Sequence, residues 1–299
     1  MKTVLGFGEW LWDMLPSGKQ MGGAPGNFAF HASQCGLKSY VVSAIGCDPL
    51  GEELLATAKK HGLQMLVARV EQPTGTVSVR LNADGVPQYQ IHEDVAWDHI
   101  PITPELTQLA HQADAICFGS LAQRSTTSRQ TLKHVLQLLK PEAMKVFDVN
   151  LRQQFYTPEI ILSSLRYTTV LKFNDEELPI VAQMLGFSDK TPEGFFHQLQ
   201  DAFGIRSLIL TCGTHGSHIF SDRQHSFLPT PTVHVADTVG AGDAFTATYC
   251  AAILKGHTLR EAHQLAVNLS AYVCTQSGAM PPWPQSLASK LRVENLRCS

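Results

Sequence analysis

Short apolar segments rich in β-branched and aromatic residues recur along the chain and alternate with segments of helical pattern. Because the apolar segments are nearly continuous in hydrophobicity, they are typical of strands covered on both faces. The predicted strands cover residues 3–8, 39–45, 115–119, 145–149, 168–173 and 207–211. The predicted helices between them include residues 51–61, 128–140, 158–166 and 175–185. Strands that alternate with helices in this way predict an α/β fold around a mostly parallel sheet.

One segment departs from this alternation. Residues 64–91 contain no convincing helical pattern, and residues 76–81 and 86–91 alternate in polarity around the sequence NADG. An Asp-Gly turn between alternating segments is typical of a β-hairpin. The hairpin would either stand off the main sheet, as a flap or a contact between subunits, or form an antiparallel edge of that sheet.

Composition and charge narrow the classes of fold and partner. The 299 residues can bury a sizeable core, and no repeat or linker divides them, so we expect a single domain over residues 1–299. The 23 basic and 26 acidic residues give a net charge of −3, which argues against nucleic acid as a partner. The seven cysteines form no C-x-x-C pair, which favours reduced, buried thiols over disulfides or a zinc site. The apolar run at residues 1–6 is too short for a signal-peptide core or a membrane span, so we expect a cytoplasmic protein without membrane association.

The strongest chemical signal is the sequence DTVGAGDAF at residues 237–245, which leads into an Ala-rich segment of helical length. Gly240, Ala241 and Gly242 lie where that helix begins, so their backbone N–H groups are free and a phosphate can come close. Asp243 lies in the first turn, beside this anion site. A carboxylate there can accept the proton of an attacking hydroxyl while the amides stabilise the transferring phosphoryl group. By itself, a G-x-G-D sequence is equally compatible with a plain helix cap.

Residues 237–245 resemble the C-terminal signature of the ribokinase-like sugar kinases, the PfkB family. The N-terminal signature of that family is matched by GGAPGNFAFH at residues 22–31, followed by GCDPLG at residues 46–51. The resemblance covers nearly the whole chain. It implies a three-layer α/β/α ribokinase-like fold with a mostly parallel central sheet and a small β lid, formed by residues of about 10–20 and 64–98. It also implies ATP and Mg²⁺, with K⁺ as a further candidate, and a homodimer that pairs through the lid.

For the sugar, the resemblance indicates residues from the two N-terminal segments. Asp13 lies shortly after the first predicted strand, where the family's substrate-binding aspartate occurs, and both of its carboxylate oxygens can accept from a vicinal diol. Gly23 would let a polyol approach the backbone, and Asn27 offers a donor and an acceptor to hydroxyl groups. Gln88 in the lid and Arg152 in the sequence DVNLR are further candidates for contacts with the sugar.

For the nucleotide, the sequence NDEE that ends at Glu177 matches the family's Asn-x-x-Glu, which implies that Glu177 helps to hold the magnesium–phosphate assembly through water. The sequence TCGTHG at residues 211–216 resembles the family's loop that lines the nucleotide with backbone amides. The resemblance also makes the main chain around Asp237, Val239 and Gly278 a candidate site for a monovalent cation. The candidate nucleotide-binding residues are Asn174, Thr211, Gly213, Gly216, Asn268 and Gly278.

The sequence argues against three other classes of protein. Gly6-Phe7-Gly8 follows the first strand, but Leu11 stands where a dinucleotide-binding fingerprint needs its third glycine. Cys212, His215 and His218 lack a further ligand at the spacing of a metal site. A sugar-binding regulator without catalysis is a third class, and the retention of Asp243 with its glycines argues against it.

The substrate stays open among three sugars. Within the family, the closest likeness is to bacterial fructokinases, carried by GGAP at residues 22–25, AWD at 96–98 and FGSLAQR at 118–124. That likeness implies transfer of the γ-phosphate of ATP to the 6-hydroxyl of D-fructose. The alternatives are 2-keto-3-deoxygluconate and ribose, and Arg80 or Arg152 could pair with the carboxylate of the keto acid.

Overall fold

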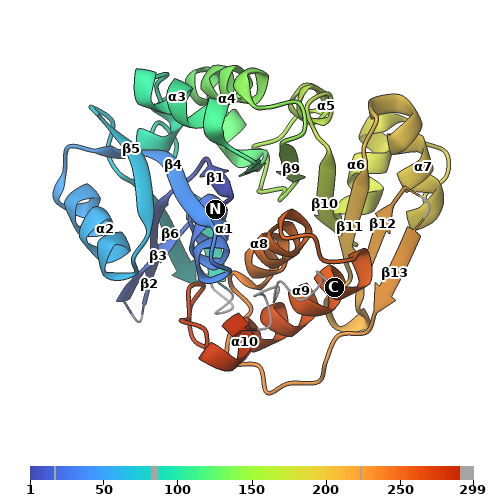
Figure 1. The fold of residues 1–299 in the computed structure, drawn as a ribbon. Helices are drawn as coiled ribbons and strands as arrows, with labels where there is room; N and C mark the ends of the chain where they lie inside the picture. Colours follow the sequence, from blue (N-terminus) through green and yellow to red (C-terminus); the bar gives the residue numbers. More distant parts are fainter. Residues whose placement is uncertain (17, 82–86, 223, 290–299) are drawn as a thin grey trace.

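A nine-stranded sheet with the order β13-β12-β11-β10-β9-β8-β1-β4-β5 forms the centre of the molecule (Figure 1). The computed structural model describes residues 1–16, 18–81, 87–222 and 224–289. The parallel strands are β1 (Thr3–Phe7), β4 (Lys38–Gly46), β5 (Gln64–Val70), β8 (Ala115–Phe118), β9 (Met144–Asp148), β10 (Val170–Asn174) and β11 (Ser207–Thr211). Two antiparallel strands, β12 (Ser217–Ser221) and β13 (Gln224–Leu228), complete one edge. The predicted mostly parallel sheet is confirmed.

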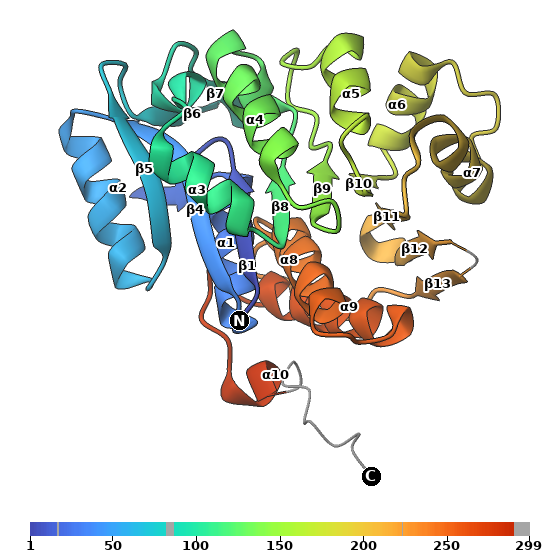
Figure 2. The same cartoon turned by 45° about the horizontal axis from the view of Figure 1, so that its top comes forward.

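Helices cover both faces of this sheet, as Figures 1 and 2 show. Val4 and Leu5 are neighbours on β1 but belong to different apolar clusters, because successive strand residues point to opposite faces. One layer contains α1 (Ala24–Gln34), α2 (Pro49–Lys60), α8 (Ala241–Leu254) and α9 (Leu259–Cys274). The other contains α3 (Pro104–Gln112), α4 (Thr126–Leu138), α5 (Pro158–Leu165), α6 (Glu177–Leu185) and α7 (Pro192–Phe203). The predicted three-layer α/β/α architecture is therefore confirmed.

A second, four-stranded sheet has the order β3-β2-β6-β7 and is separate from the main one. Its strands are β2 (Leu11–Leu15), β3 (Gly18–Gly22), β6 (Gly75–Leu81) and β7 (Pro87–Ile91). Strands β6 and β7 pair antiparallel as the predicted hairpin, whose turn at residues 82–86 lies outside the described residues. The hairpin therefore belongs to this second sheet, here named the lid sheet after its predicted role, and the alternative of an edge on the main sheet is wrong.

The segment expected to form the lid, residues 64–98, begins with a strand that belongs to the main sheet. Residues 64–70 form β5, which pairs in parallel with β4 at the edge of the main sheet. Residues 65–68 of this strand, MLVA, form a continuous apolar run like those of the other parallel strands, although most β5 side chains are only partly buried at the sheet edge. At the other end, the 3₁₀ helix η1 (Ala96–His99) packs buried Trp97 beneath the lid, in a cluster with Val77 and Ile91.

Local capping explains where several helices start. Thr157 accepts a hydrogen bond from the Ile160 backbone N–H, with Pro158 in the first turn, as that Thr-Pro pair predicts. Thr258 and Glu261 form a capping box at the start of α9. Three further short helices are η2 (Leu121–Gln123), η3 (Gly213–His215) and α10 (Gln285–Ser289). No helix in the described part of the chain has both the length and the apolar character needed to cross a membrane.

Candidate active site

The predicted site residues gather at the carboxyl ends of the parallel strands. Asp148 ends β9, Asn174 ends β10 and Thr211 ends β11. The register places Lys172 beside Asp148 and Asn174 beside Thr211. Ligands of open α/β sheets bind outside the carboxyl ends of the strands, so this edge is the candidate site.

Helix α8 begins at residues 240–242, here named the amide loop. Gly240 is the N-cap and has a φ of 77°, a left-handed conformation that glycine adopts without strain. It lies so close to Ala279 that a Cβ on Gly240 would be 2.7 Å from the Ala279 Cβ. Because Gly240 has no side chain, no side-chain oxygen caps α8. The Ala241 N–H donates to the Thr238 carbonyl at 3.3 Å, whereas the N–H groups of Gly242 and Asp243 have no acceptor among the described residues and remain available to an anion.

Asp243 lies in the first turn of α8, and its Oδ2 accepts a hydrogen bond of 2.8 Å from Nδ2 of Asn27. Burial and the negative charge of Asp148 raise the pKa of Asp243 to about 6, against the opposing effects of Asn27 and of the cations Lys172 and Arg152. The carboxylate is thus ionised at neutral pH but is a stronger base than an exposed aspartate. Such a pKa suits a group that accepts a proton during the reaction.

Sequence reasoning missed Lys172, whose signal was one lysine within the otherwise apolar strand VLKFN. Its Nζ lies 2.9 Å from Oδ2 of Asp148, and the Lys172 side chain is 11% exposed. A Cβ on Gly242 would lie 3.2 Å from this Nζ, so the ammonium group lies directly beside the amide loop. Burial lowers the pKa of Lys172, but Asp148 and then Asp243 and Glu177 raise it to a net value above the usual range. The site therefore contains a fixed positive charge where a phosphoryl group would be transferred.

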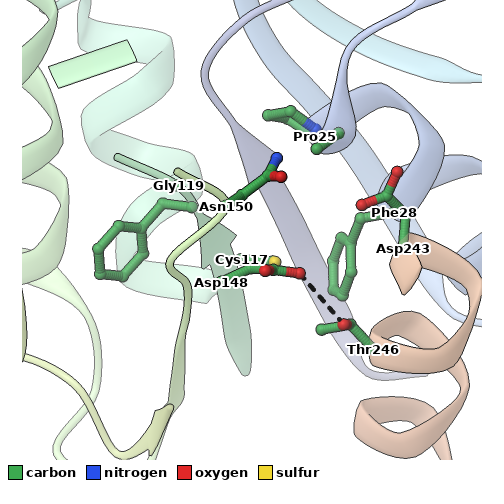
Figure 3. A pocket seen from close by; sticks show the side chains of 10 residues that line it. Pro25, Phe28, Cys117, Gly119, Asp148, Asn150, Asp243 and Thr246 are labelled. Carbon is green, nitrogen blue, oxygen red and sulfur yellow. Dashed lines mark hydrogen bonds between the residues drawn. The ribbon is translucent and has the colours of Figure 1, made fainter. Parts of the chain in front are cut away.

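Figure 3 shows the pocket between α8 and the sheet, with Asp243 at the start of α8 and Asn150 on the loop after β9. The Thr246 hydroxyl donates to Oδ2 of Asp148 at 3.4 Å, drawn as the dashed line. Apolar side chains such as Phe28 surround these polar groups. The combination of an apolar lining and a few convergent polar groups is typical of a small-molecule site.

The residues predicted to hold the sugar lie at the junction of the lid and α1. Asp13, on β2, lies against Gly22 so closely that a Cβ there would overlap its carboxylate. Burial raises the pKa of Asp13 to about 6. Gly23 is the N-cap of α1, and Asn27, one turn later, is 4% exposed and reaches Asp243. The fold therefore brings Asp13 and Gly23 to the start of α1, the helix from which Asn27 reaches Asp243.

A second acid, Glu9, lies near the site and was not predicted. It is 3% exposed, and its Oε2 has no hydrogen-bond partner among the described residues. Burial, and then the charge of Asp243, raise the pKa of Glu9 to about 7. Among the described residues, the site therefore contains more acidic groups than buried cations, with Asp148, Asp243, Glu177 and Glu9 on one side of the balance and Lys172 on the other.

Glu177 is buried and holds two loops together. Its Oε1 accepts from the Leu151 N–H at 2.7 Å and its Oε2 from the Asn174 N–H at 2.9 Å, while Oδ1 of Asn174 accepts from the Glu177 N–H. Burial raises the pKa of Glu177. Each carboxylate oxygen keeps lone-pair capacity beyond its one backbone donor, so a contact to a water of magnesium is compatible with both hydrogen bonds, and this role stays a prediction.

The predicted nucleotide loop connects β11 and β12. Thr211 ends β11, Gly213 lies in η3, and the Gly216 carbonyl accepts from the Cys212 N–H, which closes the loop. Asn268 lies on α9, where its Oδ1 accepts from Gln264, so this side chain is engaged within its own helix. The roles of these residues toward the nucleotide stay predictions.

Asp237 joins the two segments that were predicted to bind a monovalent cation. Its Oδ1 accepts from the Val239 N–H at 3.0 Å and its Oδ2 from the Gly278 N–H at 3.1 Å. The Cys274 carbonyl accepts from the N–H groups of Ala236 and Asp237. The side chain of Asp237 therefore brings together the two stretches of main chain whose carbonyl groups are the candidate ligands.

The loop after β9 reaches the lid. Nε2 of Gln153 donates to the Tyr89 carbonyl on β7 at 2.6 Å. Arg152 is exposed and donates to the Leu151 carbonyl, and its charge lowers the pKa of Asp243. Gln88 lies on β7 opposite Arg80, but its side chain is outside the described part of the structure. The contacts of Gln88 and Arg152 with a sugar stay predictions.

Curated relatives align with this chain over most of its length. It is 28% identical to a sugar kinase of Pyrococcus horikoshii over 268 residues, which cover 86% of this chain and 81% of that protein. It is 27% identical to an ATP-dependent 6-phosphofructokinase of Thermoanaerobacterium thermosaccharolyticum over 299 residues, covering 94% and 90%. A fructokinase of Vibrio alginolyticus is 26% identical over 303 residues, covering 95% and 96%.

Solved structures share the fold. A fructokinase of Xylella fastidiosa with bound ATP superposes with a TM-score of 0.82 at 22% identity, covering 97% of each chain. A 2-dehydro-3-deoxygluconokinase of Thermotoga maritima gives a TM-score of 0.83 at 20% identity, covering 97% of this chain and 99% of that one. The model of the pfkB family of carbohydrate kinases matches residues 17–286. The chain therefore belongs to the pfkB family of carbohydrate kinases, phosphotransferases that act on a sugar hydroxyl.

Proposed function

We propose that this kinase transfers the γ-phosphate of ATP to the 6-hydroxyl of D-fructose. The observation that carries the proposal is the 2.8 Å hydrogen bond from Asn27 to Asp243 at the uncapped start of α8. It joins the predicted sugar-binding helix to the predicted base beside free backbone amides. The fructokinase names among the relatives support the choice of sugar.

The proposed chemical step is a direct displacement at phosphorus. The 6-hydroxyl loses its proton to Oδ1 or Oδ2 of Asp243, and the oxygen forms a bond to the γ-phosphorus. The bond between that phosphorus and the bridging oxygen of the β-phosphate breaks, and ADP leaves with the electron pair. Asp243 then releases the proton to solvent. Fructose 6-phosphate and ADP are the products.

The charge that develops on the transferring group is stabilised by the amide loop and Lys172. The backbone N–H groups at the start of α8 would face the γ-phosphate, where the helix dipole is positive. The ammonium group of Lys172 lies beside Gly242. Magnesium, when bound to the nucleotide, would neutralise phosphate charge, with Glu177 holding its waters. Asp148 keeps Lys172 protonated and in place through contacts of 2.9 and 3.0 Å.

The proposed substrate is tested by ADP release in a coupled assay across fructose, ribose, 2-keto-3-deoxygluconate, mannose, nucleosides and fructose 6-phosphate. We expect fructose to give the highest kcat/KM. Turnover with none of these acceptors would refute the kinase mechanism. A preference for the keto acid would refute only the choice of sugar, and Arg152→Gln should then raise KM for that acid specifically. Fructose 6-phosphate is included because one relative is a 6-phosphofructokinase.

Lid closure, cation activation and pairing of two chains belong to the same proposal. The lid would exclude water from the reacting phosphate and so limit hydrolysis of ATP.

The outer strand of the lid sheet, β7, exposes 59% of Tyr89, a surface that a second copy of the chain would cover. Light scattering coupled to size exclusion should give the mass of a dimer. Replacing K⁺ by a tetraalkylammonium ion should lower the rate if the carbonyls around Asp237 bind a cation.

A further inference from the structure

Helix α1 contains a buried histidine that has no role in the proposed reaction as described so far. His31 is fully buried and lies one helical turn after Asn27. Its Nε2 is 2.9 Å from the Ala279 carbonyl, and its Nδ1 is 3.1 Å from Nε1 of Trp283. The His31 and Trp283 rings are nearly parallel, with centroids 5.8 Å apart. Both ring nitrogens are therefore engaged with the C-terminal segment of the chain.

The partners determine which tautomer His31 adopts. The indole N–H of Trp283 can only donate, so Nδ1 of His31 must be the acceptor. The proton is consequently on Nε2, which donates to the Ala279 carbonyl. Burial lowers the pKa of His31 to about 4, against the opposing effect of the Ala279 carbonyl, so the ring is neutral at physiological pH. The ring therefore has one N–H, on Nε2, and its two partners together fix this N–H toward the Ala279 carbonyl.

Ala279 is the residue against which the amide loop rests. A Cβ on Gly240 would lie 2.7 Å from both the Cβ and the carbonyl oxygen of Ala279. The preceding residue, Gly278, donates its N–H to Asp237, three residues before Gly240. A shift of Ala279 would therefore displace Gly240 and reorient the N–H groups that begin α8.

We propose that His31 is a positioning residue that sets the orientation of the amide loop through Ala279. Helix α1 then makes two contacts one turn apart: Asn27 orients the base Asp243, and His31 orients the segment that supports the amides. One rigid helix thereby holds the base and the amide loop in a constant relation. The inference deepens the proposed function and rests on it, since the loop matters only if it stabilises a transferring phosphoryl group.

The test compares His31→Gln with His31→Leu. Glutamine can donate to Ala279 and accept from Trp283, whereas leucine fills similar space and can do neither. With the amides misplaced, we expect His31→Leu to lower kcat about tenfold or more while KM for the sugar changes by less than about twofold, because Asp13 and Asn27 are intact. We expect His31→Gln to retain kcat within about threefold. All rates are measured well below each variant's melting temperature.

Trp283→Phe provides a milder variant with the aromatic ring retained. Without the indole N–H, His31 loses one of the two contacts that hold its ring, while the Ala279 carbonyl, which can only accept, still keeps the proton on Nε2. We expect the ¹⁵N signals of His31 to report the Nε2–H tautomer, and the less firmly held ring to lower kcat about three- to fivefold. If His31→Leu does not fold, this variant decides. Faster hydrogen–deuterium exchange in residues 275–279 of Trp283→Phe with an unchanged kcat would overturn the proposal.

Hydrogen–deuterium exchange on the full chain provides a readout that needs no turnover. We expect faster exchange in residues 238–243 and 275–279 of His31→Leu, and near-normal exchange there in His31→Gln. Normal exchange in both segments, or an equal loss of kcat in the two His31 variants, would refute the positioning role. Wild-type protein that turns over no sugar would instead refute the proposed function, so the two failures are distinguishable.

Discussion

Two buried ion pairs in this molecule have nearly the same exposure but different surroundings. Arg124 and Asp98 join through two bonds of 2.8 Å, with side chains 8% and 5% exposed, at the base of the lid. Lys172 and Asp148 join at 2.9 Å, with side chains 11% and 6% exposed, at the candidate site. Both pairs carry the desolvation cost of two buried charges, so burial alone does not distinguish them.

The difference lies in what surrounds each cation. The Arg124 guanidinium also donates to the His92 carbonyl and lies over the rings of Trp97 and Phe155, at 4.0 and 4.6 Å from their centroids. Carbonyl and aromatic groups carry no net charge, so this pair is balanced. Lys172, in contrast, is surrounded by further acids, because Asp243 and Glu177 also raise its pKa. A buried cation among several carboxylates, with its pKa and theirs perturbed together, is more typical of a functional site than of a structural ion pair.

The largest effect on rate should follow from removing the base. Asp243→Ala should lower kcat by about 10²–10⁴ while leaving sugar binding mostly intact, because only the proton acceptor is lost. Rapid-quench measurement of phosphoryl transfer and calorimetric sugar titration separate the two quantities. A near-normal rate would mean that another group accepts the proton, and Glu9→Gln is the variant to examine next.

The comparison of the two ion pairs predicts the next largest effect. Lys172→Met should lower kcat by about 10²-fold because a fixed charge beside the amide loop is lost. It should also destabilise the fold by roughly 3–5 kcal/mol, since Asp148 is left buried and unpaired. The double variant Lys172→Met with Asp148→Asn should recover stability but not rate. Recovery of both would show that Lys172 is only structural.

The pH dependence of the rate should follow Asp243. The pKa of Asp243 is raised to about 6, so the base is ionised above that pH and protonated below it. We expect kcat to fall about tenfold for each pH unit below about 6, and to be flat near pH 8. Stopped-flow profiles in buffers of constant ionic strength measure this. A rate that stays constant down to pH 5 would contradict the raised pKa.

Glu9 should affect stability more than rate. Its pKa of about 7 in the folded chain exceeds the ordinary value of 4.5, so its neutral form is favoured by folding. The corresponding stability is complete below about pH 4.5 and is lost as pH rises through 7. Glu9→Gln stays neutral, so its urea midpoint should exceed that of wild type at pH 8 and match it at pH 5. A reversed order would show that the ionised form is the one held by the fold.

The smallest effect on rate should come from the balanced pair. Arg124→Met should destabilise the protein by about 3–5 kcal/mol, because Asp98 loses its counter-charge, yet change kcat by less than about twofold in the folded fraction. The matched double variant with Asp98→Asn should recover stability. If kcat falls as far as in Lys172→Met, the contrast between the two ion pairs is wrong, and the lid base takes part in the reaction.

Much of the fold followed from local pattern. The six predicted strands and four predicted helices all occur, with ends that differ by a few residues, because hydrophobic periodicity reflects which face of each element is buried. Strand β5 has an apolar run, MLVA at residues 65–68, but only its pairing with β4 showed that it belongs to the main sheet and not with the hairpin that follows. The hairpin was recognised from its turn, but only the pairing of β6 with β2 showed that it belongs to a second sheet.

The order of the elements, the glycine-rich start of α8 and Asp243 as the candidate base could be predicted from the sequence, since these depend on neighbours within a few residues. Tertiary structure alone decided which charges and hydrogen bonds meet. Asn27 and Asp243 are 216 residues apart in the chain, and His31 and Ala279 are 248 apart. Lys172 acquires its role only from the register that places β10 beside β9. Such contacts leave no periodic signal, because their energy depends on positions that the folded chain alone brings together.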